Sequence, residues 1–203
     1  MSSDRRRYQL KARAARQEQT RQRIVATTSA LHEEQGPART TIAQIARRAG
    51  VQRLTVYNNY PEASDLFGAC QAHFLALHPP PDVAPSGPPE RMLERLETAL
   101  RDLYTWYRAN QAMQRNVQRD RHLLPQLDAL LKQNADPRFA AAAMGYAKEL
   151  GSDRKARGAI RTMVRVAMEF RTWELMSADG HEDREIARIF RKAVGGITGS
   201  ANL

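Results

Sequence analysis

The chain has 203 residues, of which 42% are apolar, 27% charged and 6% aromatic. This composition suffices for one or two domains with a hydrophobic core and excludes a chain that is disordered throughout. The single cysteine, Cys70, excludes an intramolecular disulfide and a zinc site built from several cysteines, and it favours a reducing compartment. No apolar stretch is long enough for a bilayer, and no apolar segment follows the basic N-terminus as in a secretory signal. We therefore expect a cytoplasmic protein with no membrane partner.

The net charge of +10 is concentrated at one end of the chain. Residues 1–60 contain 12 Lys or Arg against 4 Asp or Glu, a net charge of +8, whereas the rest of the chain carries only +2. Such asymmetry is expected when one domain binds nucleic acid or an anionic membrane surface and another domain has a different task. Arg outnumbers Lys 27 to 5, which suits phosphate recognition by guanidinium groups and equally fits a GC-rich genome.

Apolar residues recur at helical spacing through most of the chain, and no segment shows the alternation typical of a strand. The predicted fold class is therefore all-α. Predicted helices cover approximately residues 16–34, 42–49, 52–58, 62–77, 89–108, 111–119, 125–133, 137–150, 153–176 and 182–194. Six of the ten prolines fall within residues 79–89, which predicts a loop between two helical regions. The chain is thus divided into a basic arm (1–15), a first helical domain (16–78), a proline-rich loop (79–89) and a second helical domain (90–203).

The strongest local signal lies in residues 40–57, TTIAQIARRAGVQRLTVY. Thr41 and Gln44 have the spacing of a capping box, which predicts a helix start, and Gly50 allows a left-handed turn after a short helix. The apolar positions of the two helices are Ile42, Ile45, Ala46, Ala49, Val51, Leu54 and Val56. Two short helices joined by a glycine turn in a basic region predict a helix-turn-helix that binds the DNA major groove. The alternative is an ordinary helical hairpin in which Gly50 only ends the first helix.

Residues 40–66, which end in VYNNYPEASDL, resemble the DNA-binding domain of TetR-family transcriptional regulators. Residues 16–78 match the order of helices in that domain. The rest of the chain resembles the family's effector and dimerisation domain more loosely, in helix number, helix length and the segment FRTWEL at 170–175. The resemblance implies an N-terminal helix-turn-helix DNA-binding domain and a C-terminal helical ligand-binding and dimerisation domain. The family usually has a lysine two residues after the position of Pro61, where this chain has Ala63, so one phosphate contact is missing.

The resemblance also implies DNA contacts by position. Two residues before the first short helix contact a phosphate, three at the start of the second face base edges, and two at its end anchor the DNA backbone. In that order they are Thr40 and Thr41, then Gln52, Arg53 and Thr55, then Tyr57 and Asn58. A solvated helix face is the alternative for each. We further expect the basic arm, with Arg5, Arg6 and Arg7, to begin disordered and to enter a minor groove, with a solubilising tail as the alternative.

From Ile160 onward, the predicted helix at 153–176 is apolar over roughly 220° of its circumference, whereas a stripe of about 100° buries one face. We expect a second copy of the chain to supply the additional cover, because two recognition helices of a dimer reach two half-sites. The candidate interface residues are Phe170, Trp173, Ile186, Ile189 and Phe190. The alternative is a helix at the centre of its own monomer.

Binding of a small-molecule effector is a further expectation for the second domain. Two tyrosines offer hydroxyl groups within an apolar face, three methionines add adaptable volume, and one arginine lies within the apolar arc, where its charge requires a partner. These residues are Tyr104, Tyr107, Met144, Met163, Met168 and Arg171. The arginine could meet Glu174, a carboxylate of another chain or an acidic ligand. Apart from the arginine, the same residues fit an ordinary core.

No HExxH, GxSxG, GxxxxGK or GxGxxG motif is present, and the five histidines lack metal-binding spacing. We therefore expect no enzymatic activity, no cofactor and no metal site. The sequence predicts a sequence-specific transcriptional regulator, namely a ligand-responsive repressor that binds a palindromic operator in double-stranded DNA as a homodimer. The alternatives are a helical protein-interaction adaptor and an activator with the same motif.

Overall fold

The computed structural model describes residues 2–199, with side chains from residue 7 onward, and every regular element in this range is a helix. The all-α prediction is confirmed. The chain forms two compact units. The first unit comprises Met1–His78 with Arg119–Leu130, and the second comprises Pro79–Gln118 with Leu131–Leu203. No helix among residues 2–199 is both long and apolar enough to cross a membrane.

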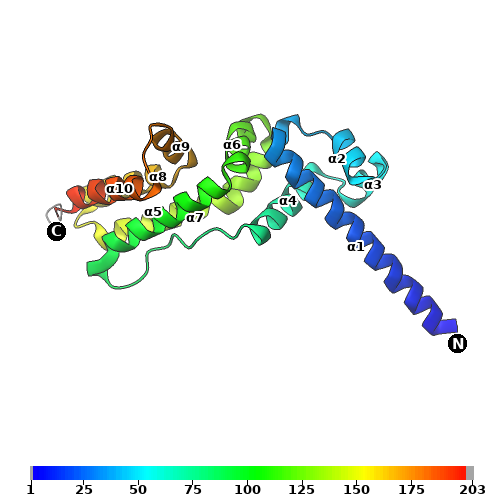
Figure 1. Cartoon of the computed structure of the whole chain (residues 1–203). Helices are drawn as coiled ribbons and strands as arrows, with labels where there is room; N and C mark the ends of the chain where they lie inside the picture. The colour runs from blue at the N-terminus through cyan, green and yellow to red at the C-terminus, as the bar shows by residue number, and fades with distance from the viewer. Residues whose placement is uncertain (1, 200–203) are drawn as a thin grey trace. The chain divides into compact units, whose positions relative to one another are not determined.

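The first unit is built on one long helix (Figure 1). Its elements are α1 (Ser2–Gln35), the short 3-10 helix η1 (Pro37–Arg39), α2 (Ile42–Ala49), α3 (Arg53–Asn59) and α4 (Ala63–Leu77). Helices α2 and α4 pack against α1, and α3 packs against α2. The buried core consists of Ile24, Val25, Leu31, Ile45, Ala46, Ala49, Val56, Tyr60, Leu66 and Cys70. This packing leaves Arg53, Leu54, Tyr57 and Asn58 of α3 exposed.

Helix α1 is longer at its N-terminus than predicted. It begins at Ser2, so the segment expected to start as a disordered arm is helical. Residues 2–15 contain no Gly or Pro and are rich in Arg, Ala, Lys, Gln and Leu, which have high helix propensity. The side chains of Arg5 and Arg6 lie outside the described side chains, and Arg7 is exposed.

The second unit holds the larger core. Its elements are η2 (Pro89–Arg91), α5 (Met92–Ala109), most of α6 (Gln111–Asp120), most of α7 (Pro125–Leu150), α8 (Arg154–Met168), α9 (Phe170–Ala178) and α10 (Asp183–Thr198). Helix α10 packs against both α5 and α8, as Figure 1 shows. The end of α6, η3 (Arg121–Leu123) and the start of α7 belong to the first unit.

The proline-rich segment is a structured loop. As predicted, residues 79–88 form no regular helix, and Val83 is buried in the core of the second unit. Arg95 on α5 donates hydrogen bonds to the carbonyl oxygen of Asp82 (2.8 Å) and to that of Ala84 (3.2 Å). These bonds replace the backbone bonds that prolines cannot make.

Two helix boundaries in the second half differ from prediction. Helix α7 continues through Pro137, where the sequence predicted a new helix, because good helix formers on both sides sustain it across one lost backbone hydrogen bond. The predicted helix at 153–176 is instead broken at Glu169, whose backbone is extended (φ −73°, ψ 130°). The break turns α9 away from the axis of α8, so residues 160–176 do not form the single apolar arc that was predicted for them.

Candidate nucleic-acid interface

The start of α2 has the predicted capping box. The hydroxyl oxygen of Thr41 accepts from the backbone N–H of Gln44 (3.2 Å), and the Gln44 side chain accepts from the backbone N–H of Thr41 (2.8 Å). The helix ends at Gly50, which is left-handed (φ 64°), and the next amide, at Val51, donates to the carbonyl oxygen of Ala46 (2.9 Å). The chain can therefore turn sharply into α3.

Helix α3 has seven residues, of which Val56 is the buried one. Val56 is fully buried, and the adjoining Val51 and Tyr60 lie against the same core. Leu54 was expected to make an apolar contact, but it is 65% exposed. Two residues before Val56 on a helix is about 200° around the axis, so the two side chains cannot share a face. Leu54 lies instead among the exposed residues of α3.

The residues predicted to face base edges are accessible. Gln52 precedes α3 and makes no capping hydrogen bond, and Arg53 is the first residue of the helix. Both are exposed, and neither side chain has a hydrogen bond or ion pair within the described part of the chain. Thr55 is half-buried, whereas Tyr57 is 51% exposed and Asn58 is exposed. Gln52 and Arg53 therefore place two exposed polar side chains, without hydrogen-bond partners in the described part of the chain, at the N-terminus of α3.

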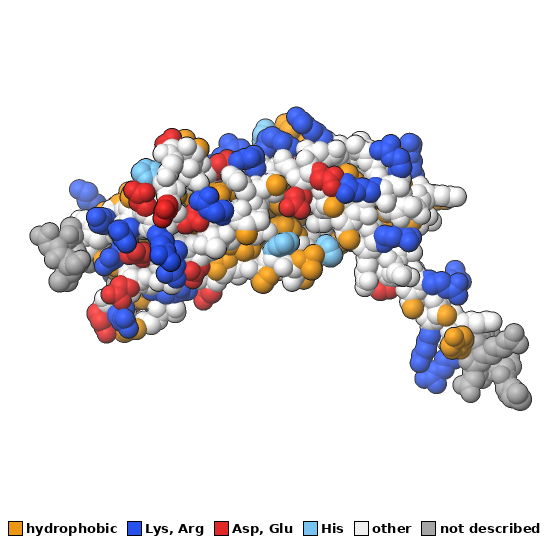
Figure 2. All heavy atoms as spheres, in the orientation of Figure 1, with side chains coloured by type: hydrophobic (Ala, Val, Ile, Leu, Met, Phe, Trp, Pro, Cys, Tyr) orange, Lys and Arg blue, Asp and Glu red, His pale blue; other side chains and the backbone are white. Residues whose placement is uncertain are grey.

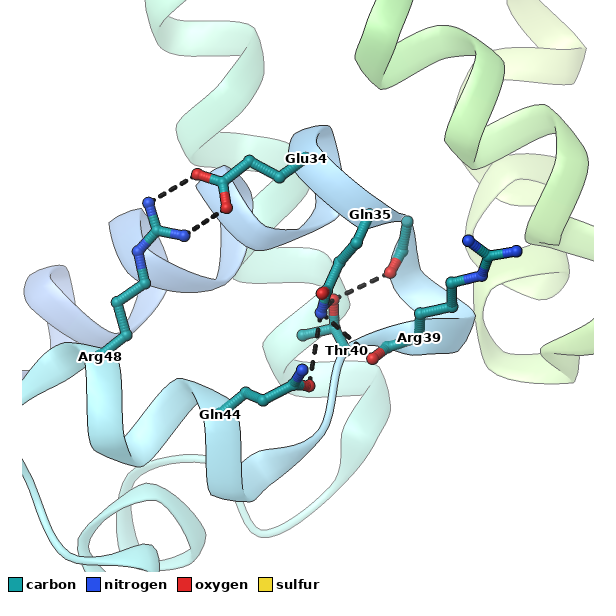
Figure 3. A network of polar contacts seen from close by, with 7 residues as sticks. Glu34, Gln35, Arg39, Thr40, Gln44 and Arg48 are labelled. Carbon is teal, nitrogen blue, oxygen red and sulfur yellow. Dashed lines mark hydrogen bonds and ion pairs between the residues drawn. The ribbon is translucent and has the colours of Figure 1, made fainter.

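The two threonines before α2 are engaged within the protein, and Figure 3 shows the contacts of Thr40. The hydroxyl of Thr40 donates to the carbonyl oxygen of Gly36 (2.9 Å) and lies 3.3 Å from the side-chain nitrogen of Gln35. The same nitrogen of Gln35 contacts the Gln44 oxygen at 3.3 Å. These bonds fix the turn between α1 and α2, so the hydroxyl proton of Thr40 is not free for a phosphate.

Arg48 on α2 is bound to α1 (Figure 3). Its guanidinium makes two bonds to the carboxylate of Glu34, of 2.5 and 2.6 Å, and these hydrogen bonds lower the pKa of Glu34 below its usual range. Arg47 is exposed, and Figure 3 shows the Arg39 side chain pointing away from this network. The positive charge available to a polyanion here is therefore that of Arg39 and Arg47 more than that of Arg48.

One residue that orients α3 was missed by the sequence reasoning. Arg21 on α1 donates to the carbonyl oxygen of Asn59 at the end of α3 (2.8 Å), and its guanidinium lies 4.6 Å from the ring centre of Tyr60. A cation at a helix C-terminus is favourable because the last carbonyl groups lack partners within the helix. The contact joins residues 38 positions apart, so no local pattern could have indicated it.

Comparison with known proteins identifies this region. The family model for bacterial regulatory proteins of the tetR family matches residues 24–70. The chain carries a TetR-family DNA-binding domain. The match runs from the buried half of α1 through α2 and α3 into α4, which are the elements that build the helix-turn-helix.

Curated proteins give no match to the chain. Among solved structures, it is similar to NalD, the secondary repressor of the MexAB-OprM multidrug efflux pump in Pseudomonas aeruginosa. That likeness has 20% identity, covers 90% of this chain and 95% of NalD, and has a TM-score of 0.48. It is also similar to a TetR transcriptional regulator from Rhodococcus sp. RHA1, with 17% identity, coverage of 91% and 99%, and a TM-score of 0.41.

The first unit also contains residues 119–130, which lie outside the match to the family model. Asp120 accepts a hydrogen bond from the amide of Ala38 (3.0 Å), and Arg119 donates to the carbonyl oxygen of Gln35 (3.1 Å). Gly36 is left-handed (φ 96°), and a Cβ at this position would clash with Arg119 and Asp120. Burial raises the pKa of Asp120, but the hydrogen bonds from Arg119 and Ala38 outweigh it and leave this pKa below its usual value.

Both tyrosines predicted to bind a ligand are used by the fold. The hydroxyl of Tyr104 donates to the carbonyl oxygen of Ala167 (2.8 Å), and that of Tyr107 donates to the carbonyl oxygen of Met168 (2.6 Å). These carbonyl groups lie at the end of α8, where the break at Glu169 removes their helical partners. Burial raises the pKa of both tyrosines above the usual value. Their hydroxyl groups therefore stabilise the break.

The other candidate ligand residues are dispersed. Met168 is buried, Met163 is partly buried against the core, and Met144 is 57% exposed on α7. Arg171 was expected within an apolar arc, but the break before α9 leaves it exposed, where it donates to the carbonyl oxygen of Gln118 (3.1 Å). Glu174, one of the three partners considered for Arg171, pairs with Arg115 instead. Because Arg171 is exposed, it carries no buried charge that requires a ligand.

The candidate interface residues lie mostly inside the second unit. Phe170, Trp173, Ile186 and Phe190 belong to its buried core, whereas Ile189 is 38% exposed. Four of the five therefore match the alternative of a helix within its own monomer, and a dimer interface stays a prediction. Among the described residues, no group of three or more His, Cys, Asp or Glu could hold a metal ion.

Proposed function

We propose that this protein is a sequence-specific transcriptional regulator that binds the DNA major groove through α3. The observation that carries the proposal is the exposed, unpaired pair Gln52 and Arg53 at the N-terminus of α3, in a TetR-family domain. The glycine turn at Gly50 and the anchor from Arg21 set the orientation of that helix before DNA binds. Preorganisation of this kind lowers the free-energy cost of binding.

Each exposed side chain has a chemical role in the proposal. Arg53 suits the O6 and N7 atoms of guanine, and Gln52 suits the N6 and N7 atoms of adenine. Tyr57 and Asn58 would contact the DNA backbone. At the start of α2, the phosphate would meet the free amide N–H groups of the first turn, because the hydroxyl groups of Thr40 and Thr41 are already bonded.

The helical form of residues 2–15 changes the role proposed for the basic arm. An α-helix with its side chains is about 10–12 Å across, whereas the minor groove of B-DNA is about 6 Å wide. A helical arm would therefore not enter the minor groove, and Arg5, Arg6 and Arg7 would instead contact phosphates from outside it.

Repression, dimerisation and effector response complete the proposal. A palindromic operator requires two copies of α3, and therefore a homodimer through the second unit, with exposed Ile189 as the candidate contact. A dimer bound at a promoter would block transcription by occupying the site. An effector would release it only if its affinity differs between the DNA-binding state and the released state.

Selection from fragmented genomic DNA tests the proposal. Full-length protein is incubated with the fragments at low and at near-physiological salt, beside Arg53→Ala and a control, Arg184→Ala, which removes an exposed charge from α10. We expect a palindromic sequence to be enriched at both salt concentrations by the unmodified protein and by Arg184→Ala, and to be lost with Arg53→Ala. Binding that is blind to sequence, abolished by salt and equal in all three proteins would contradict the proposal and favour an adaptor.

A further inference from the structure

A groove between α7 and α8 on the second unit has no assigned role. It has a volume of about 720 Å³, which lies within the usual range for small-molecule sites, about 300–1,000 Å³. Its lining residues are Met144, Ala147, Lys148, Arg154, Arg157, Gly158 and Arg161. Four of these seven carry a positive charge and none carries a negative charge. Met144 and Ala147 supply an apolar surface beside the cations.

The cations of the groove have few partners within the protein. Lys148, Arg154 and Arg161 make no ion pair or side-chain hydrogen bond among the described residues. The acidic residues nearest to them in the sequence do not neutralise them. Asp153 instead caps α8 by accepting from the amide of Ala156 (2.8 Å), and Glu149 is exposed without an ion pair in the described structure.

Several other arginines of the second unit are paired. Arg108 meets Asp183 at 2.7 Å, Arg115 meets Glu174 at 2.5 Å, and Arg191 on α10 meets Glu97 at 3.3 Å. On the face shown in Figure 2, acidic side chains gather over this unit among the basic ones. In the groove, by contrast, no carboxylate pairs with Lys148, Arg154 or Arg161 among the described residues.

The first turn of α8 is unfavourable for the helix by itself. It contains Arg154, Lys155 and Arg157 and no acidic residue. The N-terminus of a helix carries a partial positive charge, so cations there destabilise it, each by a few tenths of a kcal/mol. An anion bound at this end would be attracted both by the side chains and by the helix dipole. Apart from the carboxylate of the N-cap residue Asp153, the charge pattern of this turn thus opposes helix stability and favours anion binding.

Two glycines shape the groove. A Cβ at Gly151 would clash with Arg157, and the absence of a side chain lets Arg157 lie across the turn and donate to the Gly151 carbonyl oxygen (3.0 Å). At Gly158 no side chain or other part of the protein beyond the adjacent helix backbone lies within 4 Å of the place where a Cβ would be, so the groove is open above α8. One cation is therefore held in place while the space beside it stays empty of protein.

We propose that this groove binds a small amphiphilic carboxylate. The carboxylate head would lie among Arg154, Arg157, Arg161 and Lys148, and the apolar chain would lie against Met144 and Ala147. A second copy of the chain is a poorer occupant, because a twofold axis would bring two positive surfaces together. The proposal is independent of the regulatory function, since binding is measured without DNA.

The test is calorimetric titration of the full-length protein with dodecanoate below its micelle concentration. The blocking variant is Gly158→Leu, which fills the groove without changing charge and raises helix propensity, so that loss of binding does not reflect unfolding. The matched control is Gly196→Leu, because Gly196, like Gly158, is helical and has no neighbouring atom within 4 Å of the place where a Cβ would be. We expect one dodecanoate per chain, at least tenfold weaker binding with Gly158→Leu, and unchanged binding with Gly196→Leu.

Charge is tested separately. Arg154→Gln combined with Arg161→Gln should weaken dodecanoate binding at least tenfold, whereas Lys155→Gln, an exposed charge of the same turn outside the lining, should not. Dodecyltrimethylammonium, with the same chain and opposite charge, should not bind. The proposal is overturned if the unmodified protein does not bind dodecanoate, if the cationic analogue binds equally, or if Gly158→Leu binds like Gly196→Leu. It is also overturned if Gly158→Leu changes the oligomeric state instead, which would make the groove an interface between copies.

Discussion

Three buried tyrosines of the second unit differ in whether their hydroxyl group has a hydrogen-bond partner, and this difference determines its effect on stability. The hydroxyl groups of Tyr104 and Tyr107 donate to carbonyl groups that the break after α8 has freed. The hydroxyl of Tyr146 is equally buried, yet it has no hydrogen-bond partner in the described structure. A buried polar group costs free energy unless it is bonded, so identical substitutions at these positions should have opposite effects.

Tyr107→Phe should lower the free energy of unfolding by about 1 kcal/mol or more, because it leaves the carbonyl group of Met168 without its partner. Tyr146→Phe should raise it by about 1 kcal/mol, because it removes an unsatisfied hydroxyl. Urea unfolding followed by tryptophan fluorescence measures both, since Trp106 and Trp173 both lie in the second unit. If Tyr146→Phe destabilised the protein as much as Tyr107→Phe, the hydroxyl of Tyr146 would have a partner.

His32 should make the stability of the first unit depend on pH. Burial lowers the pKa of His32 from 6.5 to about 4, against the opposing effect of the Asp120 carboxylate, so the folded state keeps this ring neutral. Between pH 4 and 6.5 the unfolded chain binds the additional proton, and stability therefore rises with pH through this window. The contribution is complete above pH 6.5 and falls by up to about 3 kcal/mol as the pH approaches 4.

Urea unfolding followed by far-ultraviolet circular dichroism at several values between pH 4 and 7.5 measures this dependence. His32→Phe is the comparison, because a ring of similar size can still pack beside Phe67, whose ring centre lies 5.7 Å away. The variant should show a flatter pH dependence by about one proton over this window. An equally steep dependence in both proteins would assign the effect to other groups.

At the level of elements, the sequence pattern correctly predicted those features that depend on interactions between residues close together in the chain. The capping box at Thr41, the glycine turn at Gly50 and the helical periodicity all appear in the structure. The break at Glu169 could not be predicted, because it is stabilised by hydroxyl groups that lie more than 60 residues earlier in the chain. The exposure of Leu54 could have been predicted from helix geometry, because Val56, two residues later, lies on the buried face of the helix.

The orientation of α3 provides an element-level prediction. Arg21→Met keeps the apolar stem of the side chain but removes the hydrogen bond to Asn59 and the contact with the Tyr60 ring. We expect DNA affinity at the selected operator to fall about tenfold, because a hydrogen bond to a charged group contributes about 1.5–3 kcal/mol and part of this should appear as lost preorganisation. Fluorescence anisotropy with labelled operator measures the change.

Arg23→Met is the matched control for that experiment. Arg23 is an exposed arginine two residues further along α1, so the substitution removes the same charge without touching α3. We expect it to change operator affinity much less than Arg21→Met does. Equal losses in the two variants would mean that Arg21 acts only through general charge and not by orienting the recognition helix.

For the whole molecule, the two units differed in how far their roles could be predicted. The role of the first unit could be predicted from its charge, its capping residues and its turn residues, because each of these features depends only on residues close together in the sequence. In the second unit, Tyr104, Met168 and Trp173 could equally be core, pocket or interface, because all three uses favour apolar side chains. Only the three-dimensional packing shows that these three are core. The groove between α7 and α8 was not predicted from the sequence, because its four cations come from two different helices.

The N-terminal half of α1 gives the prediction that belongs to the whole molecule. Deleting residues 2–13 removes Arg5, Arg6, Arg7, Lys11 and Arg13, all of which precede the match to the TetR-family domain. Each lost phosphate contact should flatten the plot of log affinity against log salt concentration by about 0.9. Anisotropy titrations of operator DNA at four or more salt concentrations measure the slope, and an unchanged slope would show that the segment does not contact DNA.

The base composition of the DNA beside the operator tests how residues 2–13 bind. If α1 remains helical on DNA, its contacts reach phosphates only, and the deletion should weaken binding equally to operators flanked by A·T-rich and by G·C-rich DNA. If the segment unwinds and enters the minor groove, the loss should be larger with A·T-rich flanks, where the groove is narrow and more negative. A variant with the five basic residues changed to Gln keeps the length and helix propensity of the segment, so it should reproduce the flattened slope if charge is the cause. A slope that flattens only on deletion would instead point to the length of α1.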